Sequence, residues 1–302
     1  MKCTDRKYYR RRINRKRQLR TRLIIASSIL LSSLIVSLVL LGLRSGTRNI
    51  EDEKYRLGIY QSDLFAKDLC VSNEEIRFEE FERDEAFYGA LLFNVETKEV
   101  LYTEHIHERL FPASTTKIMT TYVALKYGNV DDVVTVSKNA TMVPSDSSKA
   151  GLKEGDQLTL YDLLYGLILP SGNDSAVAVA EHVAGSVEGF AKLMNEEAKR
   201  MGATRTHYVN AHGYHEEDHY TTAYDLYLIF QECLKDHTFR EIVSAKEWTA
   251  QITGRNGVKR EVRWENSNQF LNGMCEMPSG ISVLMGKTGN TSKAGKCLVL
   301  YV

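Results

Sequence analysis

Two residues one helical turn apart, Ser114 and Lys117, could supply a nucleophile and its base. They lie in the stretch FPASTTKIMTTYVAL, residues 111–125. Residues three apart on a helix share one face, so the amine of Lys117 can reach the hydroxyl of Ser114. The amine must be neutral to accept a proton, and burial or a second cation nearby favours the neutral form. No charged residue follows Lys117 until Lys126, which predicts an interior helix.

A structural interpretation of the same stretch is also open. Pro112 and Ser114 both suit the start of a helix, where a serine hydroxyl commonly caps the first turn. A lone S-x-x-K match is expected about once by chance in a chain of this length. The pair alone therefore does not distinguish catalysis from helix capping.

A second candidate motif is Ser171-Gly172-Asn173, in the segment LPSGNDSA. It lies between an apolar helical segment that ends at Pro170 and an alanine-rich helical segment. A hydroxyl and a carboxamide at this point could project into a cleft and contact a substrate. Alternatively, the segment is a polar loop in which Asn173 or Asp174 caps the second helix.

A third candidate motif is Lys287-Thr288-Gly289, in MGKTGNT at the end of an apolar strand-like segment. Gly286 and Gly289 would let another backbone approach the strand closely, because glycine has no side chain. The Lys287 ammonium and the Thr288 hydroxyl could bind an anion such as a carboxylate. A turn that ends the strand is the alternative.

These motifs need rigid elements to position them, and hydrophobic periodicity predicts such elements. Strand-like segments lie near both ends of the region, with helical segments between them. The predicted strands lie within residues 87–105, 133–137, 247–254, 260–268, 280–290 and 294–302, and the predicted helices begin at Ser114 and cover 159–170, 173–185, 187–202 and 221–236. This order predicts an α/β (α+β) domain with an antiparallel sheet and a helical cluster.

The charges of the chain are unevenly distributed, although the formal net charge of its 302 residues is zero. Residues 1–22 contain eleven Lys and Arg and one acid, a net of +10, so the rest of the chain carries −10. Residues 23–43 are uncharged and contain no proline, and as a helix they could cross the ~30 Å hydrocarbon core of a bilayer. The basic flank then places residues 1–22 in the cytoplasm and the rest outside.

We therefore expect a cytoplasmic basic tail (1–22), a transmembrane anchor (23–43), an acidic linker (44–85) and an extracytoplasmic catalytic domain (86–302) on a bacterial cell membrane. A cleaved signal peptide or a buried helix is the alternative for residues 23–43, but no A-x-A-type cleavage site follows them. Anionic lipid, not nucleic acid, is the expected partner of the basic tail.

The cysteines show no C-x-x-C spacing, which argues against a zinc ribbon or a redox dithiol. We expect free, partly buried thiols, and disulfide bonds among the four that follow the predicted anchor are left open. The five cysteines are Cys3, Cys70, Cys233, Cys275 and Cys297.

The three motifs together occur in the order S-x-x-K, S-x-N, K-T-G, which is typical of penicillin-recognising serine acyl-enzymes. The chain resembles the serine-type D-alanyl-D-alanine carboxypeptidases, the low-molecular-mass penicillin-binding proteins, over roughly residues 86–302. The resemblance extends beyond the motifs, to stretches such as FNVETKEVLYTEH, HYTTAYDL and MGKTGNTSKAGKCLV. It implies a β-lactamase/transpeptidase-like fold.

The resemblance implies catalytic roles for the first two motifs. Ser114 attacks the carbonyl of a terminal D-Ala-D-Ala bond in a peptidoglycan stem peptide, and Lys117 accepts its proton. Ser171 relays a proton to the leaving amine, and Asn173 positions the acyl chain. The reaction passes through a Ser114 acyl-enzyme and needs neither a metal nor a cofactor. β-Lactam antibiotics would acylate the same serine.

The resemblance also implies how the substrate is held. Lys287, Thr288 and Gly289 bind the terminal carboxylate. The backbone N–H groups of Ser114 and Asn290 form the oxyanion hole that stabilises the tetrahedral intermediate.

Three other outcomes fit the same motifs. The protein could be a β-lactamase or a peptidoglycan endopeptidase, although no E-x-x-x-N motif follows Asn173. It could also be an inactive module that binds peptidoglycan or β-lactams. The family normally continues beyond a strand such as 294–302 with another strand and a closing helix. We expect this C-terminal truncation to leave an open sheet edge.

Overall fold

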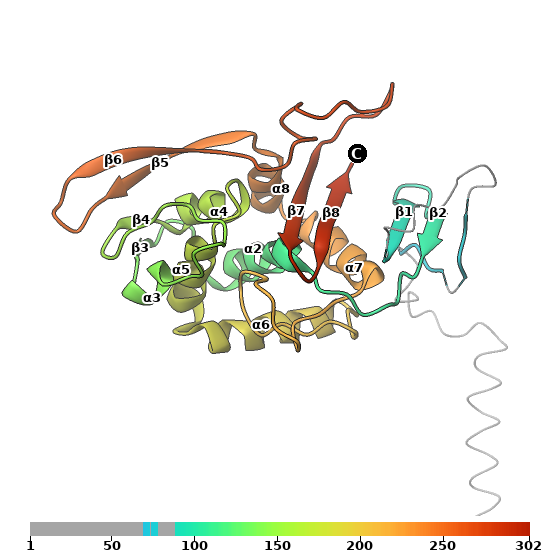
Figure 1. Ribbon diagram of the computed structural model, residues 1–302, viewed down its shortest axis with the longest axis horizontal. Helices are drawn as coiled ribbons and strands as arrows, with labels where there is room; N and C mark the ends of the chain where they lie inside the picture. Colours follow the sequence, from blue (N-terminus) through green and yellow to red (C-terminus); the bar gives the residue numbers. More distant parts are fainter. Residues whose placement is uncertain (1–68, 73, 78–87) are drawn as a thin grey trace, which may run out of the picture. The chain divides into compact units, whose positions relative to one another are not determined.

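The computed structural model describes residues 69–72, 74–77 and 88–302 (Figure 1). The predicted basic tail, the predicted anchor (23–43) and most of the predicted linker lie outside these residues, and so does Cys3. Among the described residues, no helix is long and apolar enough to cross a membrane. The other four cysteines, which are all described, are free thiols as expected.

Part of the predicted linker packs against the globular domain. Cys70 is fully buried, and its backbone N–H donates to the Tyr227 hydroxyl at 2.9 Å. Ile76 forms an antiparallel bridge with Thr103. The compact unit accordingly begins near residue 68, upstream of the predicted start at residue 86.

Strands lie toward both ends of the described part of the chain, and most of the helices lie between them (Figure 1). The strands are β1 (Ala90–Asn94), β2 (Glu99–Glu104), β3 (Val133–Thr135), β4 (Gln157–Thr159), β5 (Glu247–Thr253), β6 (Lys259–Glu265), β7 (Met285–Thr291) and β8 (Gly295–Tyr301). The helices are η1 (Ala113–Thr115, a 3₁₀ turn), α2 (Thr116–Tyr127), α3 (Lys138–Thr141), α4 (Leu160–Ile168), α5 (Asn173–Ala184), α6 (Val187–Arg200), α7 (Ala223–Cys233) and α8 (His237–Ser244). The predicted helices are confirmed, whereas α3 and α8 were not predicted.

The strands pair antiparallel, as predicted, but the described ones form three sheets and not a single one. The sheets have the orders β1-β2, β3-β4-β5-β6 and β7-β8. The β1–β2 hairpin does not pair with β8, and Phe93 of β1 packs edge-on against Tyr227 of α7. Its apolar side chains form a small cluster of their own with Cys70 and α7. Among the described strands, β8 pairs only with β7.

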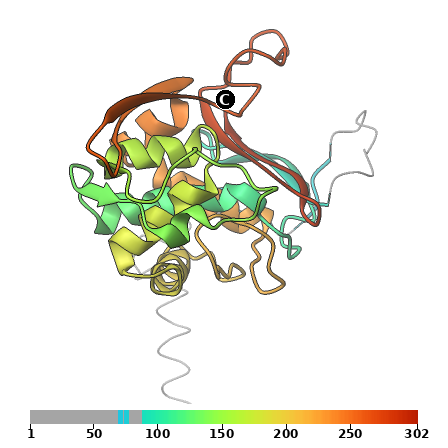
Figure 2. The same ribbon diagram turned by 60° about the vertical axis from the view of Figure 1, so that its left-hand side comes forward.

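The helical cluster forms the main core, and its centre is α5. This helix is alanine-rich and buried along its first two turns, so α2, α4 and α6 pack closely around it. It ends as predicted at Gly185, which has a positive φ of 77°. Figures 1 and 2 show β7 and β8 passing over the start of α2 and the β5–β6 hairpin lying beside α4.

A buried carboxylate joins α2 to α6. Glu197 accepts hydrogen bonds from Lys126 at 2.5 Å, from Tyr127 at 2.6 Å and from Arg200 at 2.7 Å. Its side chain is only 4% exposed, so the charge depends on these donors.

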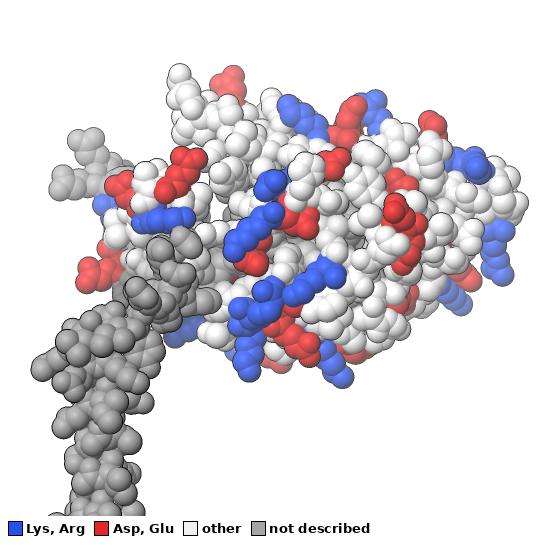
Figure 3. Space-filling model, turned by 180° about the vertical axis from the view of Figure 1, so that it is seen from behind, with Lys and Arg blue, Asp and Glu red and all other residues white. Residues whose placement is uncertain are grey.

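On the face seen in Figure 3, basic and acidic side chains are interspersed, and they form no large patch of one sign.

Removal of the Glu197 charge should destabilise the domain. Burial alone would raise the pKa of Glu197, but hydrogen bonds from Lys126, Tyr127 and Arg200 outweigh it and lower the pKa to about 2. The resulting stabilisation is present above pH ~4.5 and is lost as the pH falls toward 2. We expect Glu197→Gln to lower the free energy of unfolding at pH 7 by roughly 2–3 kcal/mol, measured by urea denaturation.

The matched control is Glu196→Gln, at an exposed position of the same helix. This variant should unfold within about 0.5 kcal/mol of the parent. Equal stability of the two variants at pH 7 would contradict the role assigned to Glu197.

Candidate active site

Ser114 lies in the tight turn that opens α2. The turn begins at Ala113, whose φ of 47° is left-handed, and Ser114 itself is partly exposed. The N-cap residues of η1 and α2 are Pro112 and Thr115, and neither caps with its side chain. The capping interpretation of Ser114 is therefore wrong, and its hydroxyl is free to face the base.

Lys117 is fully buried and has three polar contacts. Its Nζ lies 2.9 Å from Ser114 Oγ, 2.8 Å from Asn173 Oδ1 and 2.7 Å from the carbonyl oxygen of His212. An ammonium could donate one N–H to each of these oxygens, and a neutral amine also fits, because two N–H bonds can donate to the two carbonyl oxygens while the lone pair accepts the serine O–H. The contacts place the amine where a general base for Ser114 must lie.

The electrostatic surroundings also favour the neutral amine. Burial lowers the pKa of Lys117 well below its ordinary value, and the charge of Lys287 lowers it further. Asp174 opposes this effect only in part. Its carboxylate already accepts hydrogen bonds from four backbone N–H groups, those of residues 150, 151, 152 and 175.

The Ser171–Asn173 segment is a strained turn and not a capping loop. Ser171 has a φ of 61°, and its buried Oγ has no hydrogen-bond partner among the described residues. Gly172 is the N-cap of α5 and makes no side-chain cap, so the alternative that Asn173 or Asp174 caps the helix is wrong. Asn173 instead faces Lys117, which leaves the Ser171 hydroxyl available for a ligand.

Strand β7 closes the site from the other side. Lys287 is 2% exposed, its Nζ donates to the Thr288 carbonyl at 2.9 Å, and burial lowers its pKa to about 7. A Cβ added at Gly289 would lie 2.9 Å from the backbone nitrogen of Ser114. The predicted close approach at this glycine is confirmed, and the approaching backbone is that of the nucleophile turn.

The contacts of β7 do not test two of the predicted roles. Thr288 is half-buried and Asn290 is exposed, both in β7. Among the described residues, no hydrogen bond involves the side chain of Thr288 or Asn290. None joins the Asn290 backbone N–H to Ser114. Their roles in carboxylate binding and in the oxyanion hole stay predictions.

The loop after α6 completes the site, and the sequence analysis did not identify it. The His212 carbonyl accepts from Lys117, and the Ala211 carbonyl accepts from the Thr120 hydroxyl at 2.6 Å. Asn210 holds the loop in shape, since its side chain accepts from the backbone N–H of Gly213 at 2.7 Å. The cluster of Asn, His and Gly in NAHG was the available signal in the sequence. The contacts themselves come from the backbone carbonyls of Ala211 and His212, which the residue types do not reveal.

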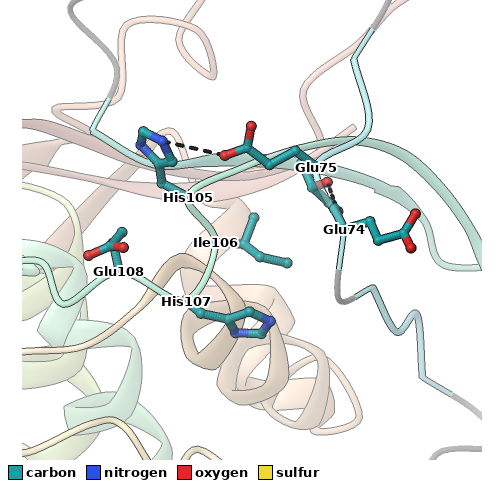
Figure 4. Close-up of a pocket in the computed structure, with 7 residues that line it drawn as sticks. Glu74, Glu75, His105, Ile106, His107 and Glu108 are labelled. Carbon is teal, nitrogen blue, oxygen red and sulfur yellow. Dashed lines mark hydrogen bonds and ion pairs between the residues drawn. The ribbon is translucent and has the colours of Figure 1, made fainter.

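A separate cavity of about 180 Å³ contains none of the motif residues. It is lined by Glu74, Glu75, Thr103 and residues 105–108 (Figure 4). His105 and Glu75 point toward each other, with 3.4 Å between Nε2 and the carboxylate, whereas His107 points away. The described residues contain no group of three or more His, Cys, Asp or Glu that could hold a metal ion.

The site and the fold define a class of protein. A serine paired with a buried lysine at a helix start, a Ser/Asn turn and a lysine-bearing strand are the parts of a serine acyl-transfer site on a transpeptidase-like α/β fold. Residues 82–301 match the model of the D-alanyl-D-alanine carboxypeptidase family, Peptidase_S11. The chain belongs to this family, as the motifs predicted.

Named relatives and solved structures agree with this assignment. D-alanyl-D-alanine carboxypeptidase DacF of Bacillus subtilis is 34% identical over 215 residues, which are 70% of this chain and 52% of the relative. The D-alanyl-D-alanine carboxypeptidase of Streptomyces sp. strain K15 is 35% identical, over 71% of this chain and 75% of the relative. The crystal structure of the Streptomyces K15 DD-transpeptidase is similar with a TM-score of 0.62 and 36% identity, over 68% of this chain and 80% of that one.

The chain thus spans about half the length of the Bacillus relative. D-alanyl-D-alanine carboxypeptidase DacC of Escherichia coli gives the same picture, with 36% identity over 69% of this chain and 51% of the relative.

Gly213→Ala should displace the nucleophile. A Cβ at this position would lie 1.8 Å from the Ala113 carbonyl oxygen, and the φ of Gly213 is +81°. The Ala113 peptide group must move, and Ser114 moves with it. We expect Ser114 to be acylated by a fluorescent penicillin at least ~30-fold more slowly, because ångström-scale misplacement has such effects.

Gly257→Ala is the matched control. Gly257 has a similar φ of +77°, and nothing lies within 4 Å of its added Cβ, so this variant carries the backbone strain alone. Equal acylation rates in the two variants would show that the contact between Gly213 and Ala113 does not position Ser114.

Proposed function

We propose that the domain formed by residues 86–302 is a serine-type D-Ala-D-Ala carboxypeptidase that acts on peptidoglycan stem peptides. The observation that carries the proposal is the buried Lys117 amine, which contacts Ser114, Asn173 and the His212 carbonyl. This arrangement supplies an activated serine at neutral pH without a carboxylate or a metal. The names of the similar proteins supply the substrate class.

In the first half of the reaction, Ser114 Oγ forms a bond to the carbonyl carbon of the penultimate D-alanine. Lys117 takes the hydroxyl proton. The Ser171 hydroxyl, which has no partner among the described residues, passes its proton to the leaving nitrogen and regains one from Lys117, and the terminal D-alanine departs as the C–N bond breaks. Asn173 holds the acyl chain, and the Ser114 and Asn290 N–H groups stabilise the oxyanion.

In the second half, water attacks the ester on Ser114. Its proton passes to Lys117, which returns it to Ser114 Oγ as the ester C–O bond breaks and the shortened peptide leaves. β-Lactams would form the same ester and leave slowly. The buried carboxylate near the site, that of Asp174, is saturated by four backbone N–H groups, so it offers no additional base for rapid β-lactam hydrolysis. This observation favours a carboxypeptidase over a β-lactamase.

Lys287 is the proposed anchor for the terminal carboxylate, with Thr288 and Gly289 beside it. The uncharged residues 23–43 support the further proposal that the protein is anchored in a bacterial cell membrane with this domain outside.

The proposal is tested on the full chain in detergent or lipid. Fluorescent penicillin should label the parent covalently, and a stem pentapeptide ending in D-Ala-D-Ala should release D-alanine. Ser114→Ala should abolish both signals, because no second nucleophile replaces the serine. Label that persists in this variant, or a labelled parent that releases no D-alanine, would contradict the carboxypeptidase. Rapid recovery of unlabelled enzyme would indicate a β-lactamase, and transfer of the acyl group to an added amine would indicate a transpeptidase.

The activity should fall as the pH rises through about 7. The ammonium of Lys287 is the form that binds a carboxylate, and burial lowers its pKa to about 7, so this form is lost above that pH. Values of kcat/KM report the free enzyme. We expect kcat/KM for a peptide with a free terminal carboxylate to decline about tenfold per pH unit well above pH 7, while a peptide amide shows no such decline.

Lys287→Arg is the control, because a guanidinium stays protonated across this range. The decline should disappear in this variant even if its overall rate is lower. An unchanged decline in Lys287→Arg would assign it to another group.

A further inference from the structure

We propose that Thr116 and His219 are positioning residues for the reaction, because they hold the strained peptide group that carries the nucleophile. The inference rests on the proposed function of Ser114 as that nucleophile. His219 lies 105 residues after Ser114, in the loop region between α6 and α7. Both residues are buried; Thr116 occupies an unspecified position of the S-x-x-K motif, and His219 lies outside the three motifs.

The direction of each hydrogen bond follows from one backbone amide. The Val209 N–H can only donate, and it donates to Nδ1 of His219 at 3.1 Å. The ring proton of neutral His219 is therefore on Nε2, which donates to Thr116 Oγ1 at 2.9 Å. The Thr116 hydroxyl in turn donates to the Ala113 carbonyl at 2.8 Å. The three bonds form a single chain in which each donor polarises the next.

Burial supports the neutral ring. Burial, together with repulsion from His207, Lys117 and His215, lowers the pKa of His219 to about 3. The imidazole thus stays neutral, with its proton on Nε2, over the whole pH range in which the protein would work.

The chain ends on the peptide group between Ala113 and Ser114. Peptide groups are planar and trans, so the Ala113 carbonyl and the Ser114 N–H point in opposite directions within one plane. An oxygen fixed in place fixes the direction of that N–H, which is the proposed oxyanion donor. Ala113 needs such restraint because its φ of 47° is unfavourable for a residue with a side chain.

The surrounding backbone also limits where the peptide group can lie. Gly213 lies against its oxygen, and Gly289 of β7 lies against its nitrogen. The Thr116 hydroxyl adds a directed bond to these steric limits. Thr116 and His219 thus act through Ser114 and do not themselves touch the substrate.

A pair of variants at Thr116 separates the hydroxyl from the shape of the side chain. Thr116→Val keeps the volume and removes the hydroxyl. Thr116→Ser keeps the hydroxyl and removes a methyl group. We expect Thr116→Val to be acylated by fluorescent penicillin about tenfold more slowly than the parent, mainly through the first-order acylation step and not through the initial binding. Thr116→Ser should recover most of that loss.

A second pair tests the ring atom by atom. The amide nitrogen of glutamine can take the place of Nε2, and the amide oxygen of asparagine can take the place of Nδ1. His219→Gln should therefore keep the bond to Thr116 and acylate faster than His219→Asn, which keeps only the acceptor for Val209. A residue that merely filled the core would predict similar losses in both variants, because both remove the imidazole.

Amide hydrogen exchange of residues 113–117 supplies a readout that does not require acylation. Exchange in this segment should be faster in Thr116→Val than in Thr116→Ser, and faster in His219→Asn than in His219→Gln. It is measured at temperatures well below the melting point of each variant. If the parent is labelled but exchange and acylation are unchanged in Thr116→Val, the inference is overturned and the proposed function stands. A parent that is not labelled would overturn the proposed function, and the exchange data would then decide whether the hydrogen-bond chain holds the turn.

Discussion

Complete desolvation of the Lys117 amine is the constraint on which the rest of the site depends. Removal of an ammonium from water is costly, so a lysine in this position has a strongly lowered pKa. The interior around it offers carbonyl oxygens from Asn173 and His212 and no free carboxylate. A second buried lysine, Lys287, adds a repulsion that an ion pair would have cancelled. Three separate elements therefore cooperate to favour the neutral form of one amine.

The same elements also hold strained backbone at the two hydroxyl groups. Ala113, directly before Ser114, and Ser171 both have left-handed φ values, which are uncommon for residues other than glycine. Such strain persists only where the surroundings determine the conformation. Gly213 and Gly289 enclose the first turn, and close packing of Gly172 against the Gly166 carbonyl encloses the second. The glycines thus matter less as flexible points than as places where backbones meet.

The sequence predicted what depends on local patterns. The helix over 173–185 is confirmed to within a residue, because its small residues and Gly185 act locally. The motif residues Ser114, Lys117 and Asn173 meet as predicted. The order of the three motifs along the chain allowed this prediction without knowledge of the tertiary structure. The division into three sheets could not be predicted, because strand pairing depends on packing partners distant in sequence. The His212 contact was missed for a related reason, since every residue type has a backbone carbonyl.

A lowered lysine pKa serves both halves of the proposed reaction. A strong base would take the Ser114 proton readily but would then remain protonated and could not activate water in the second half. Lys117 avoids this problem because its environment penalises the ammonium formed in the first step. That penalty favours passage of the proton onward to Ser171, in the turn next to Asn173, once Ser171 has protonated the leaving nitrogen; among the described residues the Ser171 hydroxyl has no hydrogen-bond partner. Burial of one amine thus explains both the activation of the serine and the return of the base to its working form.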